Sequence, residues 1–132
     1  MSLDIGIADD RSTVICRDEP LLCLEDDGYY WFLHSGFERL GAETGQYIDL
    51  YGMASFEGDK RLALAQMLAE VRVLAEVHPE FFRLYVQTQS QALHEGAFKP
   101  IERRRLLSLI THWQIVVDRA QELNRAVLCV GD

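Results

Sequence analysis

Apolar residues recur at intervals of three and four along two long stretches of the chain, which predicts two amphipathic helices. The first covers about 60–77, and the second covers about 101–124, where the apolar face continues for about five turns. A shorter aromatic helix is expected over about 28–42, because Tyr30, Leu33, Phe37 and Leu40 share one face, although the aromatic run in this segment also suits a strand.

Residues at the ends of these segments fit the expected helix boundaries. An Asp side chain can accept a hydrogen bond from the first free backbone N–H groups of a helix, and Gly or Asn can adopt the left-handed conformation that ends one. We expect N-terminal caps at Asp26 or Asp27 and at Asp59, and C-terminal caps at Gly41 or Gly45 and at Asn124.

Shorter apolar or alternating runs predict the strands. Residues 13–16 and 21–24 are nearly continuous apolar runs, which indicates strands buried on both faces, whereas 81–89 alternates like a half-buried strand. Extended pieces are also expected around 47–51 and 54–56. The last helix leads directly into the apolar segment 126–130, which favours a position for that strand in the middle of the sheet.

These elements predict one α+β domain over 1–132. It would contain a single layer of about four to six mostly antiparallel strands, with the two long helices packed on one face. A chain of 132 residues can bury a core without disulfides or a metal. Cys16, Cys23 and Cys129 lie in apolar runs without metal or redox spacing, so we expect buried free thiols and a cytoplasmic protein.

Acidic residues outnumber basic ones, with 21 Asp and Glu against 13 Lys and Arg and a net charge of −8. This balance argues against nucleic acid and anionic membranes as partners, and no apolar run is long enough to span a bilayer. Residues 1–59 hold 13 acids and three bases, and residues 60–132 hold eight acids and ten bases. Either the two halves neutralise each other in the fold, or the acids face a partner.

No motif in the sequence predicts a cofactor, a metal site or a catalytic residue. Phosphate-binding glycine loops are absent, and the four histidines lack metal-ligand spacing. Asp49 lies between apolar residues, where it would act either as a partly buried acid or base or, more commonly, as an acceptor for the N–H groups of its own turn.

Three consecutive arginines start the last helix, where the helix dipole disfavours positive charge. They are Arg103, Arg104 and Arg105. Either nearby acids such as Glu102 compensate for them, or a carboxylate or phosphate ligand does.

The segment from Phe37 to Gly52 contains the order F-E-x-L-x-x-x-T-G-x-x-I-D-L-Y-G, and the chain closes with C-V-G-D. In these motifs the chain resembles a family of small uncharacterised bacterial proteins that share a T-G-x-x-I-D-x-Y-G block and a closing C-x-G-D. Small acidic families of this kind look like immunity proteins of toxin systems. The resemblance implies a shared structural feature formed by Thr44, Gly45, Asp49, Tyr51, Gly52, Gly131 and Asp132.

Two functions are therefore expected as alternatives. The first is a non-enzymatic acidic protein that binds a basic, toxin-like protein partner, as an immunity protein or inhibitor does. Its partner-binding residues would be acids and aromatic residues near predicted helix starts: Glu25, Asp26, Asp27, Tyr29, Tyr30, Trp31, Glu57 and Asp59. The second is a small-molecule site or small enzyme built around Asp49, Tyr51 and the three arginines. A homodimer through the aromatic segment 29–32 is compatible with either.

Overall fold

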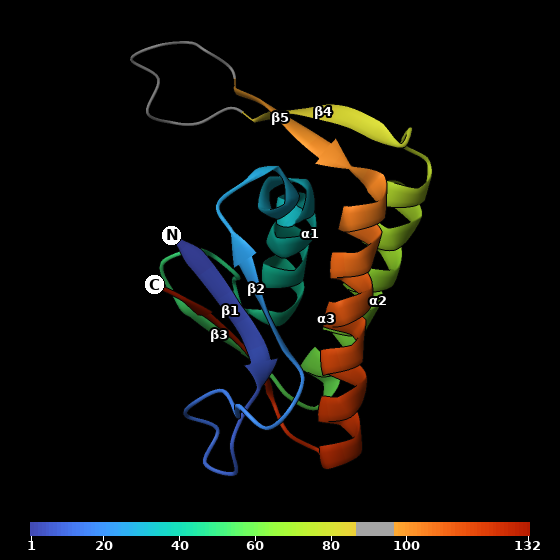
Figure 1. Ribbon diagram of the computed structural model, residues 1–132. Helices are drawn as coiled ribbons and strands as arrows, with labels where there is room; N and C mark the ends of the chain where they lie inside the picture. Colours follow the sequence, from blue (N-terminus) through green and yellow to red (C-terminus); the bar gives the residue numbers. More distant parts are fainter. Residues whose placement is uncertain (87–96) are drawn as a thin grey trace.

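The computed structural model describes residues 1–86 and 97–132, and in this part of the chain three helices accompany six antiparallel strands (Figure 1). The helices are α1 (Gly28–Thr44), α2 (Asp59–Glu76) and α3 (Arg103–Leu123). The strands are β1 (Ser2–Ile7), β2 (Leu21–Glu25), β3 (Met53–Phe56), β4 (Phe81–Val86), β5 (Ala97–Glu102) and β6 (Val127–Gly131). The predicted α+β class is confirmed, but the strands form two sheets rather than one layer.

The larger sheet has the strand order β2-β1-β6-β3, so the last strand lies in its interior, as predicted. Leu3, Ile5 and Ile7 of β1 point toward the helices and are fully buried in a core that all three helices share. Figure 1 shows the helices on one side of this sheet. Residues 8–16 cross part of its other side, where Ile15 packs against Ala8 and Leu128.

The smaller sheet is the hairpin of β4 and β5. It lies over the end of α2 and the starts of α1 and α3 (Figure 1). Alternation was predicted correctly for β4, where Phe82, Leu84 and Val86 are more buried than the residues between them. The end of the predicted strand, 87–89, falls outside the described residues. Residues 101–102 extend β5, so the last helix starts at Arg103 rather than at 101.

The strand predictions near the N-terminus need correction. Residues 13–16 form a loop with one isolated bridge, between Ala8 and Ile15, because the Asp9 carboxylate accepts hydrogen bonds from backbone N–H groups there. The first strand of the chain is instead β1, where Leu3, Ile5 and Ile7 alternate with other residues, and the sequence analysis did not predict it. β2 is buried on one face only, so Cys23 is exposed, and Cys16 is partly exposed, whereas Cys129 is buried.

Most of the predicted helix caps are confirmed. Asp27 accepts a hydrogen bond from the Tyr29 N–H, and Gly45 and Asn124 end α1 and α3 in the left-handed conformation. Asp59 is not a cap, because Gly58 takes that position and Asp59 lies in the first turn of α2. Residues 47–51 form no strand. None of the described helices is both long and apolar enough to cross a membrane.

Arg61 is the one charged side chain that is buried in the described part of the chain, with 5% of its surface exposed. Its Nε donates to Gln121 Oε1 at 2.8 Å, its Nη2 to Asn124 Oδ1 at 3.0 Å and its Nη1 to the Arg125 carbonyl at 2.5 Å. These acceptors surround the C-terminus of α3, which is the negative end of the helix dipole. The start of α2 is thereby joined to the turn that leads into β6.

Replacing Arg61 should strongly destabilise the protein, since the three hydrogen bonds that join α2 to the end of α3 would be lost and the buried stem of the side chain would leave a cavity. We expect Arg61→Ala to lower the free energy of unfolding by about 3 kcal/mol and Arg61→Lys to lower it by less, measured by urea denaturation. Lys60→Ala, at an exposed neighbour, should change it by less than about 0.5 kcal/mol. Equal losses for Arg61→Ala and Lys60→Ala would contradict this role.

Candidate functional site

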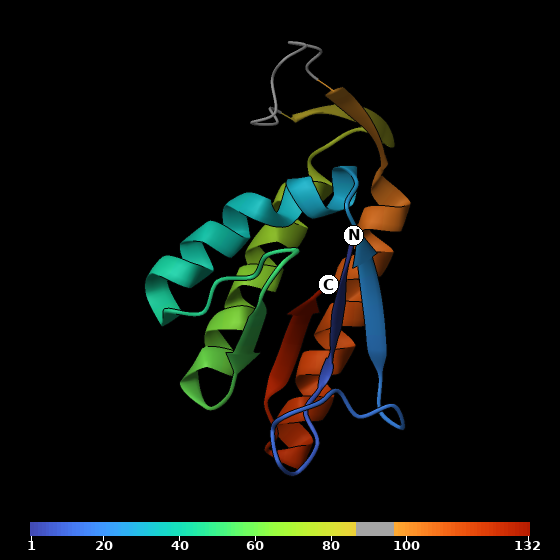
Figure 2. The same ribbon diagram turned by 90° about the vertical axis from the view of Figure 1, so that its left-hand side faces the viewer.

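Four acidic residues from three separate parts of the sequence gather at one end of the larger sheet. Glu25 ends β2 opposite Ser2 of β1, and Asp26 follows it. Ser2 N–H donates to Asp132 Oδ1 at 2.9 Å, which holds the residue after β6 beside the start of β1. Asp49 precedes β3, and Figures 1 and 2 show both ends of the chain at this place. We call Glu25, Asp26, Asp49 and Asp132 the acidic end.

Aromatic residues lie among these acids. The indole Nε1 of Trp31 donates to Asp26 Oδ1 at 3.1 Å, and Tyr51 is 72% exposed. Tyr30 is only 2% exposed, and its pKa is raised to about 12, first by burial and then by the negative charges of Asp49 and Asp26. Asp26 and Asp49 therefore both disfavour the ionised form of this hydroxyl.

The backbone of this region is fixed by short contacts. Asp49 is exposed, and its Oδ1 accepts hydrogen bonds from the N–H groups of Tyr51, at 2.7 Å, and Gly52, at 2.6 Å. Of the two roles expected for Asp49, the structure therefore shows the acceptor for the N–H groups of its own turn. Gly131 N–H donates to the Gly52 carbonyl at 2.8 Å, and a Cβ on Gly131 would lie 2.3 Å from the Leu50 carbonyl carbon.

The other motif residues also hold the backbone. Thr44 Oγ1 donates to the Leu40 carbonyl at 2.7 Å and accepts from Gln46 N–H at 3.1 Å, and Gly45 takes the left-handed cap position. Hydrogen bonds from Ser2 lower the pKa of Asp132. Thr44 and Gly45 thus fix the end of α1, whereas Asp49, Tyr51, Gly52, Gly131 and Asp132 fix the backbone beside the acidic end.

The two halves of the chain do not neutralise each other. All 13 acids of residues 1–59 are exposed or partly exposed. Within the described residues, one of them pairs with an arginine, namely Glu19 with Arg119 at 2.9 Å, and Glu38 lies 3.4 Å from His34. No member of the acidic end forms an ion pair with a described residue. The acidic end therefore faces solvent without an ion pair among the described residues, and the amino group of Met1 partly offsets the charge of Asp132.

Several predicted partner-binding residues lie elsewhere or are unsuitable. The Asp27 carboxylate is used as the helix cap, and Tyr29 is 8% exposed, with its hydroxyl accepting from Glu102 N–H at 3.1 Å. Tyr30 is also buried. Glu57 and Asp59 follow β3 at the opposite end of the sheet from Asp132, since β3 and β6 run antiparallel.

The three arginines at the start of α3 do not act together. Arg103 Nη1 donates to the His78 carbonyl at 2.8 Å, Arg104 is exposed, and the Arg105 guanidinium lies over the Tyr29 ring, 5.0 Å from its centre. Arg105 lines a cavity that contains neither Asp49 nor Tyr51. The predicted small-molecule site is therefore not assembled as a unit in this cavity.

Sequence reasoning missed most of that cavity, since Arg83 and Lys99 were not singled out. Burial raises the pKa of the Cys129 thiol, and mainly burial raises that of Cys23, so neither is activated as a nucleophile. The described residues contain no group of three or more His, Cys, Asp or Glu that could hold a metal.

Comparison of the chain with protein-family models, curated proteins and solved structures found no match.

The close approach at Gly131 can be tested by adding one methyl group. Gly131→Ala places a Cβ against backbone atoms of Leu50 and Tyr51, and we expect it to lower the free energy of unfolding by about 3 kcal/mol. Gly52→Ala is the control, because its Cβ would meet the Asp49 carboxylate at 3.2 Å, which can move. Urea denaturation of both variants measures the difference, and similar losses would argue against the close approach.

The surroundings of Tyr30 predict a pH dependence of stability. An unfolded tyrosine ionises near pH 10, whereas the raised pKa of about 12 keeps Tyr30 protonated in the folded protein. Unfolding therefore releases a proton between these pH values, and stability falls as the pH rises through them. We expect Tyr30→Phe to make the fall in the urea midpoint shallower, and Tyr47→Phe, at an exposed tyrosine, to leave it unchanged. An unchanged slope in Tyr30→Phe would refute this.

Proposed function

We propose that the protein is a non-enzymatic binding protein that recognises a basic protein partner through the acidic end. The observation that supports this is the set of four exposed carboxylates, without ion pairs among the described residues, next to the exposed ring of Tyr51. The Thr44–Gly52 block and the C-terminal residues resemble a small uncharacterised bacterial family, and because several small acidic families of this kind look like immunity proteins, inhibition of a basic toxin is the role that we propose for this surface.

Electrostatic attraction would speed the encounter of this surface with a basic partner. Charges of one sign on a protein surface raise the rate of encounter with an oppositely charged partner by about 10-fold to 1,000-fold, and salt screens the effect. Exposed tyrosine and tryptophan rings then supply contact area. Trp31 and Tyr51 are placed for such contacts at the margin of the acidic end.

The acidic end is also fixed before any partner arrives. Asp132 is bonded to Ser2, Asp49 to its own turn and Asp26 to Trp31, so three of the four carboxylates have a defined position. A preorganised surface loses little conformational entropy on binding. This rigidity favours a tight inhibitor over a flexible adaptor.

The test starts with a photo-crosslinking amino acid placed at Tyr51 or, as a control, at Leu62, an exposed residue of α2. In cells of the native host, position 51 should capture a basic protein that position 62 does not. Capture of no basic protein, or equal capture at both positions, would refute the proposal.

The captured partner then allows a charge-matched comparison. Glu25→Gln/Asp26→Asn removes two charges from the acidic end, and Glu57→Gln/Asp59→Asn removes two from the opposite end of the sheet. We expect the first pair to slow association several-fold at 50 mM salt and to weaken its salt dependence, measured by surface plasmon resonance. The second pair should have little effect. Equal effects would show that only the overall charge matters.

A further inference from the structure

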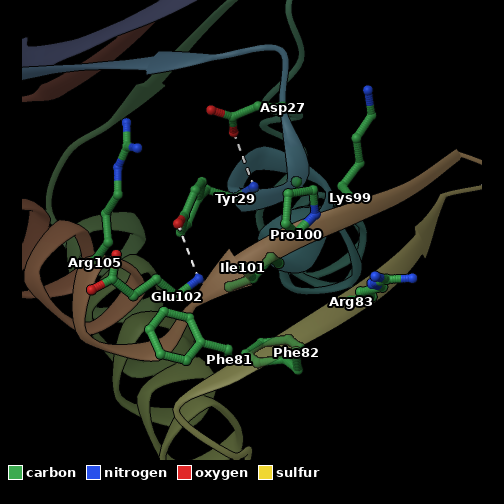
Figure 3. Close-up of a pocket in the computed structure, with 11 residues that line it drawn as sticks. Asp27, Tyr29, Phe81, Phe82, Arg83, Lys99, Pro100, Ile101, Glu102 and Arg105 are labelled. Atoms are coloured by element: carbon green, nitrogen blue, oxygen red, sulfur yellow. Dashed lines mark hydrogen bonds between the residues drawn. The ribbon is translucent and has the colours of Figure 1, made fainter.

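A cavity of about 550 Å³ lies where the hairpin meets the starts of α1 and α3 (Figure 3). Tyr29, Pro100 and Ile101 form an apolar wall, and Phe81 lies at one side. Its position is set by the fold, because Gly28 is pressed against β5, where a Cβ would lie 2.8 Å from the Lys99 Cβ. This volume is in the range of sites for small organic molecules.

Hydrogen bonds hold the elements around the cavity in place. Glu102 N–H donates to the Tyr29 hydroxyl at 3.1 Å, which ties β5 to α1. Arg103 N–H donates to the Glu80 carbonyl at 2.9 Å, and the Arg103 side chain donates to the His78 carbonyl. The start of α3 is thus fixed to the segment that leads into β4, and the cavity is formed without a ligand.

The charges of the cavity come from different elements. Arg83 of β4, Lys99 of β5 and Arg105 of α3 are its cations, and Asp27 and Glu102 are its acids. None of the three cations forms an ion pair with a described residue, and Asp27 is occupied as the helix cap. Figure 3 shows Lys99 and Arg105 extending in the same general direction on either side of Tyr29.

The strand edge beside the cavity cannot bind an added peptide strand. Its outward N–H at Glu102 is bonded to Tyr29, and Pro100, two residues earlier, has no N–H to donate. Pairing of an extended peptide with this stretch of β5 would lack those donors. The cavity therefore suits a compact ligand that is recognised by side chains.

We infer that this cavity is a binding site for a small aromatic carboxylate. The anion would lie near Arg105 and Lys99, since a guanidinium binds a carboxylate in a bidentate fork. The ring would pack against Pro100 and Phe81, which are exposed at the cavity. This site is separate from the acidic end and does not depend on the function proposed for it.

Fluorescence titration with 8-anilinonaphthalene-1-sulfonate tests the site, because its sulfonate stands in for the carboxylate. N-phenyl-1-naphthylamine has the same rings without the charge. We expect the sulfonate to bind at least 10-fold more tightly than the neutral compound, and benzoate, but not inorganic phosphate, to displace it. Equal affinity of the two dyes would overturn the inference, and so would displacement by phosphate at the same concentration as benzoate.

Variants locate the binding. Arg105→Gln and Lys99→Gln should each weaken binding of the sulfonate at least threefold and leave the neutral dye unchanged. Arg104→Gln is the matched control, since Arg104 is exposed on the same turn of α3 and does not line the cavity. Equal weakening by Arg104→Gln and Arg105→Gln would overturn the inference, because it would show attraction to the helix start in general.

Discussion

The buried guanidinium of Arg61 is the interaction on which the rest of the fold depends. A charged group in the interior is costly unless hydrogen bonds and nearby dipoles compensate for it, and Arg61 has no carboxylate partner among the described residues. Its compensation comes from the end of α3 and the carbonyl of Arg125, directly before β6. Because this contact fixes where α3 stops, it also fixes where the chain turns back into the centre of the sheet.

The position of β6 explains how the acidic end forms. β6 pairs with β1 on one side and β3 on the other, so its last residues lie between the start of the chain and the turn at Asp49. Acids that are spread over more than 100 residues of sequence are then neighbours in space. Basic residues of the second half lie away from this place: Arg61 is buried, and Arg103 donates to the His78 carbonyl. The asymmetry of charge along the sequence thus becomes an asymmetry of the surface.

Sequence patterns predicted the helices well because each one buries a single stripe, which leaves a period of three to four residues. β1 has the period of two in Leu3, Ile5 and Ile7, but Asp4 and Gly6 between them have low strand propensity, and the apolar run 13–16 was mistaken for the strand. The hairpin could not be predicted as a separate sheet, because Lys99 and Pro100 make β5 look like a loop. The acidic end and the cavity depend on contacts between distant segments, which no local pattern reports.

The approach of Gly131 to Leu50 has a consequence for how such a protein can diverge. The contact is made by backbone atoms, so it constrains the identity of one glycine but places little demand on the side chains around it. Descendants could therefore keep the same glycine and turn residues while exchanging the charges and rings beside them. The short glycine and turn motif would stay the same among proteins that share this backbone arrangement. The surface residues that determine which partner binds would be free to change.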